Sequence, residues 1–240
     1  MEPSDADRGL IEDLVAANHI LCDQGVVDGF GHISARHDKH PHRFLLARNL
    51  APAQVSAADI LTFDLDGNTL GGDTRPVYLE RFIHSEIYRA RPDVMAVVHS
   101  HSPSIIPFGV VKDVALRPIF HMAGFLGASG ASTPIFEIRT VDAESDLLIR
   151  DAKLGAALAV SLGRNPVVLM RGHGATAVGR NVRQAVYRAI YAEINARLQA
   201  AAMQLGTVTY LNDAEATRFT AGIDSQIDRA WNFWKMRVAG

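Results

Sequence analysis

The stretch YRARPDVMAVVHSHSP, residues 88–103, decides how this chain folds. It begins as the end of a helix, which Pro92 stops because proline cannot continue a helix. Residues 94–98 form a short, continuous apolar run, which is typical of a buried strand. This strand runs directly into His99 and His101. Because residues i and i+2 of a strand point to the same face, we expect both imidazoles to lie on one face.

Helical and strand patterns alternate on both sides of this stretch. Apolar residues at helical spacing predict helices at residues 5–25, 77–91, 144–162, 182–205 and 212–237. Short apolar runs predict strands within residues 29–36, 44–47, 94–101 and 166–170, and a hairpin over 60–70. No internal repeat or low-complexity linker divides the chain. We therefore expect residues 1–240 to form a single α/β/α domain.

Composition argues against several classes of protein. The chain has 240 residues, a formal net charge of −2 and a single cysteine, Cys22. There is no basic stripe of the kind that binds nucleic acid, and no apolar run reaches the roughly 20 residues that span a bilayer. The acidic start lacks the apolar segment of a signal peptide, so we expect a cytoplasmic protein. One cysteine cannot form an intrachain disulfide or a zinc–thiolate cluster.

Three histidines at the ends of predicted strands indicate a metal site. His99 and His101 follow one strand, and His173 follows another, PVVLM at 166–170, in a turn between two glycines. Three neutral imidazoles leave positions open on a bound ion, which is the pattern of a catalytic site. The alternative is that these are ordinary surface histidines, and the residues alone leave both interpretations open.

Glu80 and two arginines are further candidates for chemistry. Glu80 lies at the start of a predicted helix, where it either stabilises the helix dipole or acts as a general acid/base. Arg48 and Arg75 flank turns, where a guanidinium can bind a carboxylate or can simply be solvated. The segment GFGHIS lacks the third glycine of a dinucleotide fingerprint, and no P-loop occurs, so an ATP or NAD enzyme is not expected.

Taken together, these segments resemble the class II aldolase/adducin family. The resemblance is carried by GHIS at 31–34, Glu80 followed by His84, the stretch 88–103, and RGHGATAVG at 171–179. It implies an α/β/α sandwich around a central mixed, largely antiparallel sheet. It also implies a homotetramer with active sites at subunit interfaces. Each subunit would hold one divalent metal ion through His99, His101 and His173, with Glu80 as the catalytic acid/base.

Departures from the sugar-phosphate aldolases of that family indicate a different substrate. Where those aldolases have G-N-x-S, this chain has GHIS, so that His32 replaces the asparagine. Hydroxyl residues that hold a phosphate are missing from LLARNLAP (45–52) and from PVYLE (76–80). The segments 47–55, 71–84 and 117–127 are instead similar to a decarboxylase branch of the family, whose substrates are ortho-hydroxylated pyridine and benzene dicarboxylates.

This resemblance predicts a metal-dependent, non-oxidative decarboxylase of an ortho-hydroxylated aromatic dicarboxylate. Mn²⁺ is the expected ion, with Zn²⁺ or Fe²⁺ as alternatives. Burial is expected to raise the pKa of Glu80 so that it can deliver a proton. The expected substrate-binding residues are Arg48, Arg75, His32, His121 and Asn49. The alternatives are an aldolase that cleaves a hydroxy-keto acid or sugar, a metal-dependent oxygenase, and a non-enzymatic adducin-like module.

Overall fold

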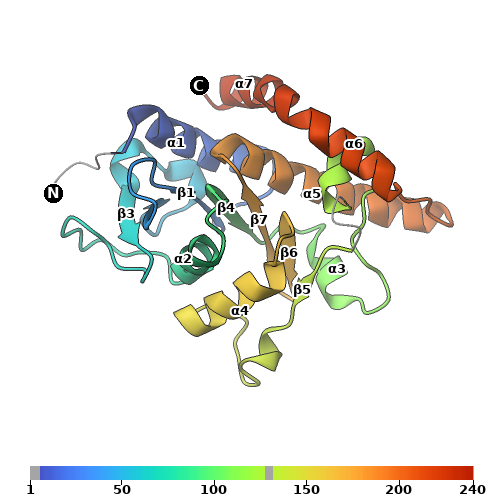
Figure 1. Ribbon diagram of the computed structural model, residues 1–240, viewed down its shortest axis with the longest axis horizontal. Helices are drawn as coiled ribbons and strands as arrows, with labels where there is room; N and C mark the ends of the chain where they lie inside the picture. Colours follow the sequence, from blue (N-terminus) through green and yellow to red (C-terminus); the bar gives the residue numbers. More distant parts are fainter. Residues whose placement is uncertain (1–5, 128–131, 240) are drawn as a thin grey trace.

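The structure, a computed structural model, describes residues 6–127 and 132–239. Its centre is a seven-stranded mixed sheet with the order β3-β2-β1-β4-β7-β6-β5 (Figure 1). The strands are β1 His32–Arg36, β2 Arg43–Ala47, β3 Ile60–Asp64, β4 Ala96–Ser100, β5 Ile135–Phe136, β6 Val167–Met170 and β7 Gly174–Gly179. The helices are α1 Arg8–Asp23, α2 Arg81–Ala90, α3 Ile106–Val110, α4 Ala152–Leu162, α5 Val182–Leu205, α6 Asp213–Ile223 and α7 Ile227–Val238.

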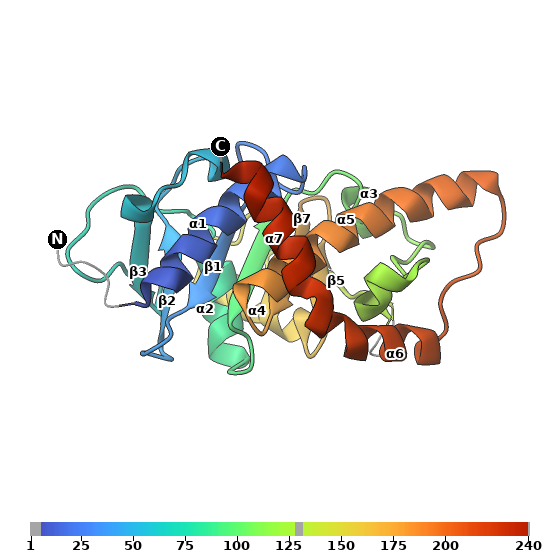
Figure 2. The same ribbon diagram turned by 90° about the horizontal axis from the view of Figure 1, so that it is seen from above.

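Helices cover both faces of the sheet. Helices α1, α5 and α7 pack against one another on one face, while α2 and α4 pack together on the other (Figure 1). Seen from above, α7 runs across α1 and α5, and α6 lies beyond it toward the far end of α5 (Figure 2). The strands pair antiparallel except for β5 and β6, which are parallel. The predicted α/β/α sandwich with a largely antiparallel sheet is therefore confirmed.

Strand β4 is the middle of the sheet, as its apolar run predicts. Its residues are all buried, between β1 on one side and β7 on the other. The antiparallel register places His32 of β1 and Thr176 of β7 directly opposite His99. Side chains at paired positions point to the same face of a sheet. The register therefore brings a second histidine beside the predicted ligand.

Helix α2 begins at Arg81 rather than at residue 77, where the sequence pattern places its start. Residues 76–78 bond across to residues 49 and 50 instead. The N–H of Asn49 donates to the carbonyl of Pro76 at 2.8 Å, and the hydroxyl of Tyr78 donates to the carbonyl of Leu50 at 2.5 Å. Glu80 thereby becomes the residue that precedes the helix, where it caps no backbone N–H.

The start of α4 and the predicted hairpin also differ from the sequence pattern. Helix α4 begins at Ala152 rather than at residue 144, capped by Asp151, whose side chain accepts the N–H of Leu154. The residues before it form turns, in which Leu147 has the left-handed φ of 75°. In the hairpin, β3 ends at Asp64, and its partner strand is reduced to one bridge between Phe63 and Thr69. The spacing of apolar residues along the sequence does not predict these turns.

Helix α5 holds the chain that follows the predicted ligands on β4. The buried carboxylate of Glu193 accepts the hydroxyl of Ser102 at 2.5 Å and the N–H of Ser104 at 3.1 Å. Further along the helix, Asn195 and Gln199 bond the backbone between residues 115 and 119. These polar side chains are buried and paired, as buried polar groups must be. Across the described chain, no helix has the length and apolar character needed to cross a membrane.

Close packing of α2 on α4 depends on Gly155. A Cβ atom there would lie 2.4 Å from the carbonyl oxygen of Phe82 and 2.9 Å from Cγ of Glu86. We expect Gly155→Ala to lower the free energy of unfolding by about 1–3 kcal/mol, since overpacking forces the helices apart. Urea denaturation followed by circular dichroism measures this.

The matched control for this substitution is Gly222→Ala in α6. This glycine is also helical, but nothing lies within 4 Å of its Cβ position. Alanine stabilises a helix by about 1 kcal/mol relative to glycine, so the free energy of unfolding of this variant should equal or slightly exceed that of the wild type. Equal stability of Gly155→Ala and Gly222→Ala would contradict the packing argument.

Candidate metal centre

The structure brings together the three histidines that the sequence singles out. His99 is the fourth residue of β4, His101 follows the end of that strand, and His173 lies in the turn from β6 to β7. Nε2 of His101 is 3.3 Å from Nε2 of His99 and 3.0 Å from Nε2 of His173. Three nitrogen lone-pair positions therefore converge on one point.

Two glycines allow the β6–β7 turn to approach β4 this closely. Gly172 has the left-handed φ of 67°, which a side chain disfavours. A Cβ atom at Gly174 would lie only 2.0 Å from the carbonyl oxygen of Ser100. The close approach therefore depends on Gly174, whereas Gly172 supplies the left-handed turn. His173 can reach His101 because the residue after it has no side chain.

Glu80 completes the cluster from the end of the segment that precedes α2. Its Oε2 is 3.6 Å from Nε2 of His99 and 3.5 Å from Nε2 of His173. Its Oε1 accepts the backbone N–H of Ile149 at 2.9 Å. The side chain is about 10% exposed, so it is enclosed but not sealed from a ligand.

The pKa of Glu80 differs from the sequence-based expectation. Burial alone would raise the pKa of this carboxyl group, as predicted. Hydrogen bonding and charge from His173 and His99 outweigh burial, however, and hold the pKa of Glu80 well below its ordinary value. The expectation of a raised pKa is therefore wrong, because it considered burial without the histidines. Glu80 is a carboxylate at neutral pH.

One loop orients both Glu80 and His173, and sequence reasoning missed it. Ile149 donates to Glu80, and two residues earlier the carbonyl of Leu147 lies 2.9 Å from Nδ1 of His173. A carbonyl can only accept, so Nδ1 of His173 carries the proton and its Nε2 keeps a lone pair for a ligand. Leu147 adopts its left-handed φ in this position. Such strain in a non-glycine residue clusters at functional sites.

The donor set fits a divalent cation. At a metal–nitrogen distance of about 2.1 Å, neighbouring ligands of an octahedral or tetrahedral ion lie about 3.0–3.4 Å apart. The separations of Nε2 of His101 from Nε2 of His99 and of His173 match this spacing. Burial, with added repulsion from His99 and His173, lowers the pKa of His101 to about 4, so that its imidazole is neutral and able to bind. Donor atoms of Glu80 and the three histidines all lie within 4.8 Å of one another.

His32 lies beside this cluster and is tied to a chain of buried polar groups. Its ring centroid is 5.1 Å from that of His99, and its Nδ1 is 2.7 Å from Nε2 of His84. Nδ1 of His84 is 2.6 Å from the hydroxyl of Ser34, which is 2.8 Å from the hydroxyl of Tyr88. These four side chains are between 0% and 5% exposed. The sequence singled out His32, but nothing in it indicated the chain behind it.

The two arginines predicted to bind substrate are paired with carboxylates in the structure. Nε of Arg48 donates to Asp59 at 2.7 Å, and Arg75 donates to both carboxylate oxygens of Asp73. Asp59 also lies 3.7 Å from Arg75. Tyr78 connects this cluster to the metal centre. Its ring centroid lies 4.5 Å from that of His32, and burial raises the pKa of its hydroxyl while the positive charge of Arg48 acts to lower it. Each arginine side chain remains about a third exposed.

The other two predicted substrate-binding residues lie outside the cluster. Asn49 is exposed, and its backbone bonds Pro76. His121 begins a 3-10 turn, His121–Leu126, and its exposed ring packs edge-on against Phe219 of α6 at 4.6 Å. Neither side chain joins the four converging groups within this chain.

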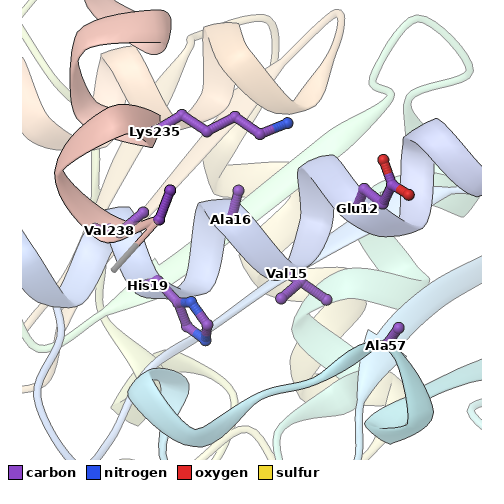
Figure 3. Close-up of a pocket in the computed structure, with 8 residues that line it drawn as sticks. Glu12, Val15, Ala16, His19, Ala57, Lys235 and Val238 are labelled. Carbon is purple, nitrogen blue, oxygen red and sulfur yellow. The ribbon is translucent and has the colours of Figure 1, made fainter.

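A groove beside α1 is not part of this centre. It lies between α1 and α7 and is lined by apolar residues together with Glu12, His19 and Lys235 (Figure 3). None of the residues predicted for the site lines it.

These features place the chain in a family. Residues 12–200 match the class II aldolase and adducin N-terminal domain, so the chain belongs to that family. It is 35% identical to decarboxylase tropJ of Talaromyces stipitatus, over 95% of this chain and 93% of the relative. It is 34% identical to 3,4-dihydroxyphthalate decarboxylase of Arthrobacter keyseri, over 76% of this chain and 74% of the relative. The predicted resemblance to the decarboxylase branch is confirmed.

Solved structures show the same fold. An aldolase II superfamily protein from Pseudomonas syringae superimposes with a TM-score of 0.80. The match covers 98% of this chain and 94% of that chain at 24% sequence identity.

Removal of one converging histidine tests the metal centre. We expect His101→Ala to weaken Zn²⁺ binding by about 100-fold or more, because changes even in groups that merely orient ligands cost about 10–100-fold. Calorimetric titration of metal-stripped protein and elemental analysis of the purified variant measure this. His42→Ala, at an exposed position, is the control and should bind like the wild type. A full metal complement in His101→Ala would contradict the site.

The Asp59 ion pairs predict a pH dependence of stability. Burial alone would raise the pKa of Asp59, but hydrogen bonds from Ser56 and Arg48 outweigh it and lower the pKa. A carboxylate with a lowered pKa stabilises the fold above its unfolded pKa of about 4, and this stabilisation is lost as the pH falls through the folded value. Asp59→Asn should therefore cost about 1–2 kcal/mol at pH 7, with the difference shrinking below about pH 4.

Urea denaturation at pH 7 and at pH 3.5 measures the two differences between wild type and Asp59→Asn. Asp113→Asn, at an exposed position, is the control and should change stability little at either pH. A cost for Asp59→Asn that is the same at both pH values would show that the carboxylate charge contributes nothing.

Proposed function

We propose that this chain is a metal-dependent, non-oxidative decarboxylase of an ortho-hydroxylated aromatic dicarboxylate. The observation that carries the proposal is the clustering of three imidazole nitrogens and a carboxylate oxygen of Glu80 within 4.8 Å of one another. Similarity to relatives named as decarboxylases, one of them acting on 3,4-dihydroxyphthalate, supports an enzyme of the carboxy-lyase class. An adducin-like structural module would have no need of this donor set.

Decarboxylation replaces the carboxylate on a ring carbon with a proton, so the site must deliver a proton to that carbon and accept the electron pair of the bond that breaks. A divalent ion held by the three histidines would stabilise negative charge on the substrate oxygen beside the reacting carbon. We propose Mn²⁺ as this ion, with Zn²⁺ and Fe²⁺ as alternatives, because imidazole ligands accept all three.

Glu80 supplies the proton path. Because it is ionised, it first takes the proton of the substrate hydroxyl on Oε2, while Oε1 stays bonded to Ile149. Oε2 then gives the proton to the ring carbon that bears the carboxylate. The bond from that carbon to the carboxylate then breaks, its electron pair passes through the ring to the deprotonated hydroxyl oxygen, and CO₂ leaves. A proton from water restores the hydroxyl. No oxidant is required.

The remaining predicted residues have roles that depend on where the substrate extends. Arg48 and Arg75 are proposed to bind its second carboxylate. Each guanidinium would then contact both the substrate and the aspartate with which it is already paired, Asp59 or Asp73. Asn49 lies next to Arg48 and is proposed to contact the same group. We propose that His121 acts in the site of a neighbouring subunit, within a cytoplasmic homotetramer of the kind the family resemblance implies.

CO₂ release under anaerobic conditions tests the function. Metal-stripped protein with added Mn²⁺ would be incubated with 3,4-dihydroxyphthalate and with a hydroxypyridine dicarboxylate. We expect CO₂ from at least one of them without oxygen. Release that needs oxygen would indicate an oxygenase, and no release from metal-loaded protein would favour an aldolase acting on a hydroxy-keto acid or sugar.

Substitution of Glu80 tests the proton path. Glu80→Gln keeps the size of the side chain but cannot carry the proton, so we expect turnover to fall by about 10²–10⁴-fold. Zn²⁺ affinity should change less than in His101→Ala, if Glu80 acts on the substrate rather than as a ligand. Glu144→Gln, at an exposed position, is the control. Turnover near the wild-type rate in Glu80→Gln would rule out the proton role.

A further inference from the structure

The hydrogen-bond chain from Tyr88 to His32 has a direction. The hydroxyl of Tyr88 is buried, and its side-chain partner is Ser34 Oγ. If Ser34 donated to Tyr88, the proton of Tyr88 would be buried without an acceptor, which costs about 1–3 kcal/mol. Tyr88 therefore donates to Ser34. Ser34 has one proton of its own, which then goes to Nδ1 of His84.

This direction fixes the tautomers of both histidines. Burial lowers the pKa of His84 to about 3, so its ring is neutral and carries one proton. Because Nδ1 accepts from Ser34, that proton is on Nε2 and is donated to Nδ1 of His32. A neutral His32 whose Nδ1 accepts must carry its own proton on Nε2.

Nε2 of His32 is the end of the chain, and it has no hydrogen-bond partner within residues 6–127 and 132–239. His32 is 95% buried, with 5% of its surface exposed. Its ring lies between Tyr78 at 4.5 Å and His99 at 5.1 Å. An N–H on a residue that is 95% buried, with no partner in the described residues and beside the metal centre, indicates a ligand that accepts a hydrogen bond.

We propose that Tyr88, Ser34 and His84 are positioning residues that hold His32 in its Nε2–H form, so that His32 donates to an anionic oxygen of the substrate. Donation to a charged acceptor is roughly twice as strong as donation to a neutral one. For an aromatic substrate this oxygen belongs to a carboxylate or to an ionised ring hydroxyl. The identity of the substrate class rests on the proposed function, whereas the tautomer rests on the hydrogen-bond chain alone.

Nuclear magnetic resonance tests the tautomer directly. Proton–nitrogen correlation through two bonds distinguishes protonated from bare imidazole nitrogens in ¹⁵N-labelled protein, both metal-free and loaded with Zn²⁺. The signals of His32 are identified by their loss in His32→Gln. We expect a proton on Nε2 and a bare Nδ1. A proton on Nδ1, or a mixture of tautomers, would overturn the inference, and this spectrum needs no substitution within the chain behind His32.

Two substitutions of His84 separate positioning from mere packing. His84→Leu fills the space but leaves Nδ1 of His32 without a donor, whereas the amide of His84→Gln can donate to His32 and accept from Ser34. Phthalate and catechol are the binding probes, because the first offers carboxylates and the second ring hydroxyls. We expect His84→Leu to weaken binding of one probe by about tenfold and His84→Gln to stay within about threefold.

The probe that responds identifies which oxygen His32 contacts. If both probes bind both variants as they bind the wild type, the positioning role is wrong. In turnover, the same variants should raise KM more than they lower kcat, since the proton path through Glu80 is unchanged.

The outcomes separate this inference from the proposed function. If the tautomer and the probe affinities are as expected but no CO₂ is released by the wild type, the function is wrong and the donor role of His32 stands. If CO₂ is released and His32 carries its proton on Nδ1, the function stands and the donor role is wrong.

Discussion

The contact between the end of β4 and the start of β7 is the constraint on which this site depends. Gly174 lies against the carbonyl of Ser100 at a distance that leaves no room for a Cβ atom. That approach places the β6–β7 turn over the end of β4, so that His173 meets His99 and His101. The core beneath is fully apolar along residues 96–98 of β4, which makes the sheet a rigid support. Of the three predicted ligands, His99 is thus held by strand pairing, while His101 and His173 directly follow strands whose ends are held together.

The supporting groups around the cluster determine what each side chain can donate or accept. The carbonyl of Leu147 leaves His173 with a free lone pair, whereas the chain through His84 leaves His32 with a free N–H. Two histidines in one site thereby present opposite polarities to a ligand. Such orienting contacts are as much a part of a metal site as the ligands themselves. These orienting contacts come from residues of β1, of α2 and of the loop before α4. The site therefore depends on the packing that brings these three elements together.

The sequence predicts the parts of the site that sit on regular elements, and it misses those that depend on distant contacts. The buried strand, the H-x-H pair and the glycines around His173 are local patterns, so the amino-acid sequence indicates the three histidines as candidates, although those residues alone leave ordinary surface histidines as an alternative. The bond from Ile149 to Glu80 spans 69 positions and involves only a backbone N–H, which leaves no trace in composition. For the same reason the lowered pKa of Glu80 is not predictable from burial alone. The start of α2 differs from the periodic pattern because residues 76–78 bond to a neighbouring turn instead of to one another.

Charge explains why a cation, an acidic group and an anionic substrate can share this space. Metal binding requires neutral imidazoles, and Glu80 is ionised, so in their metal-binding form the four groups together carry a charge of about −1. Arg48 and Arg75 are balanced by Asp59 and Asp73, and they add little net charge nearby. Alone, this arrangement would repel an aromatic dicarboxylate. A divalent ion would reverse the sign to about +1, which makes the binding of substrate conditional on the metal. In the proposed reaction, the same reversal would hold Glu80 ionised until the substrate hydroxyl offers its proton, and this order of events would let one carboxylate act first as a base and then as an acid.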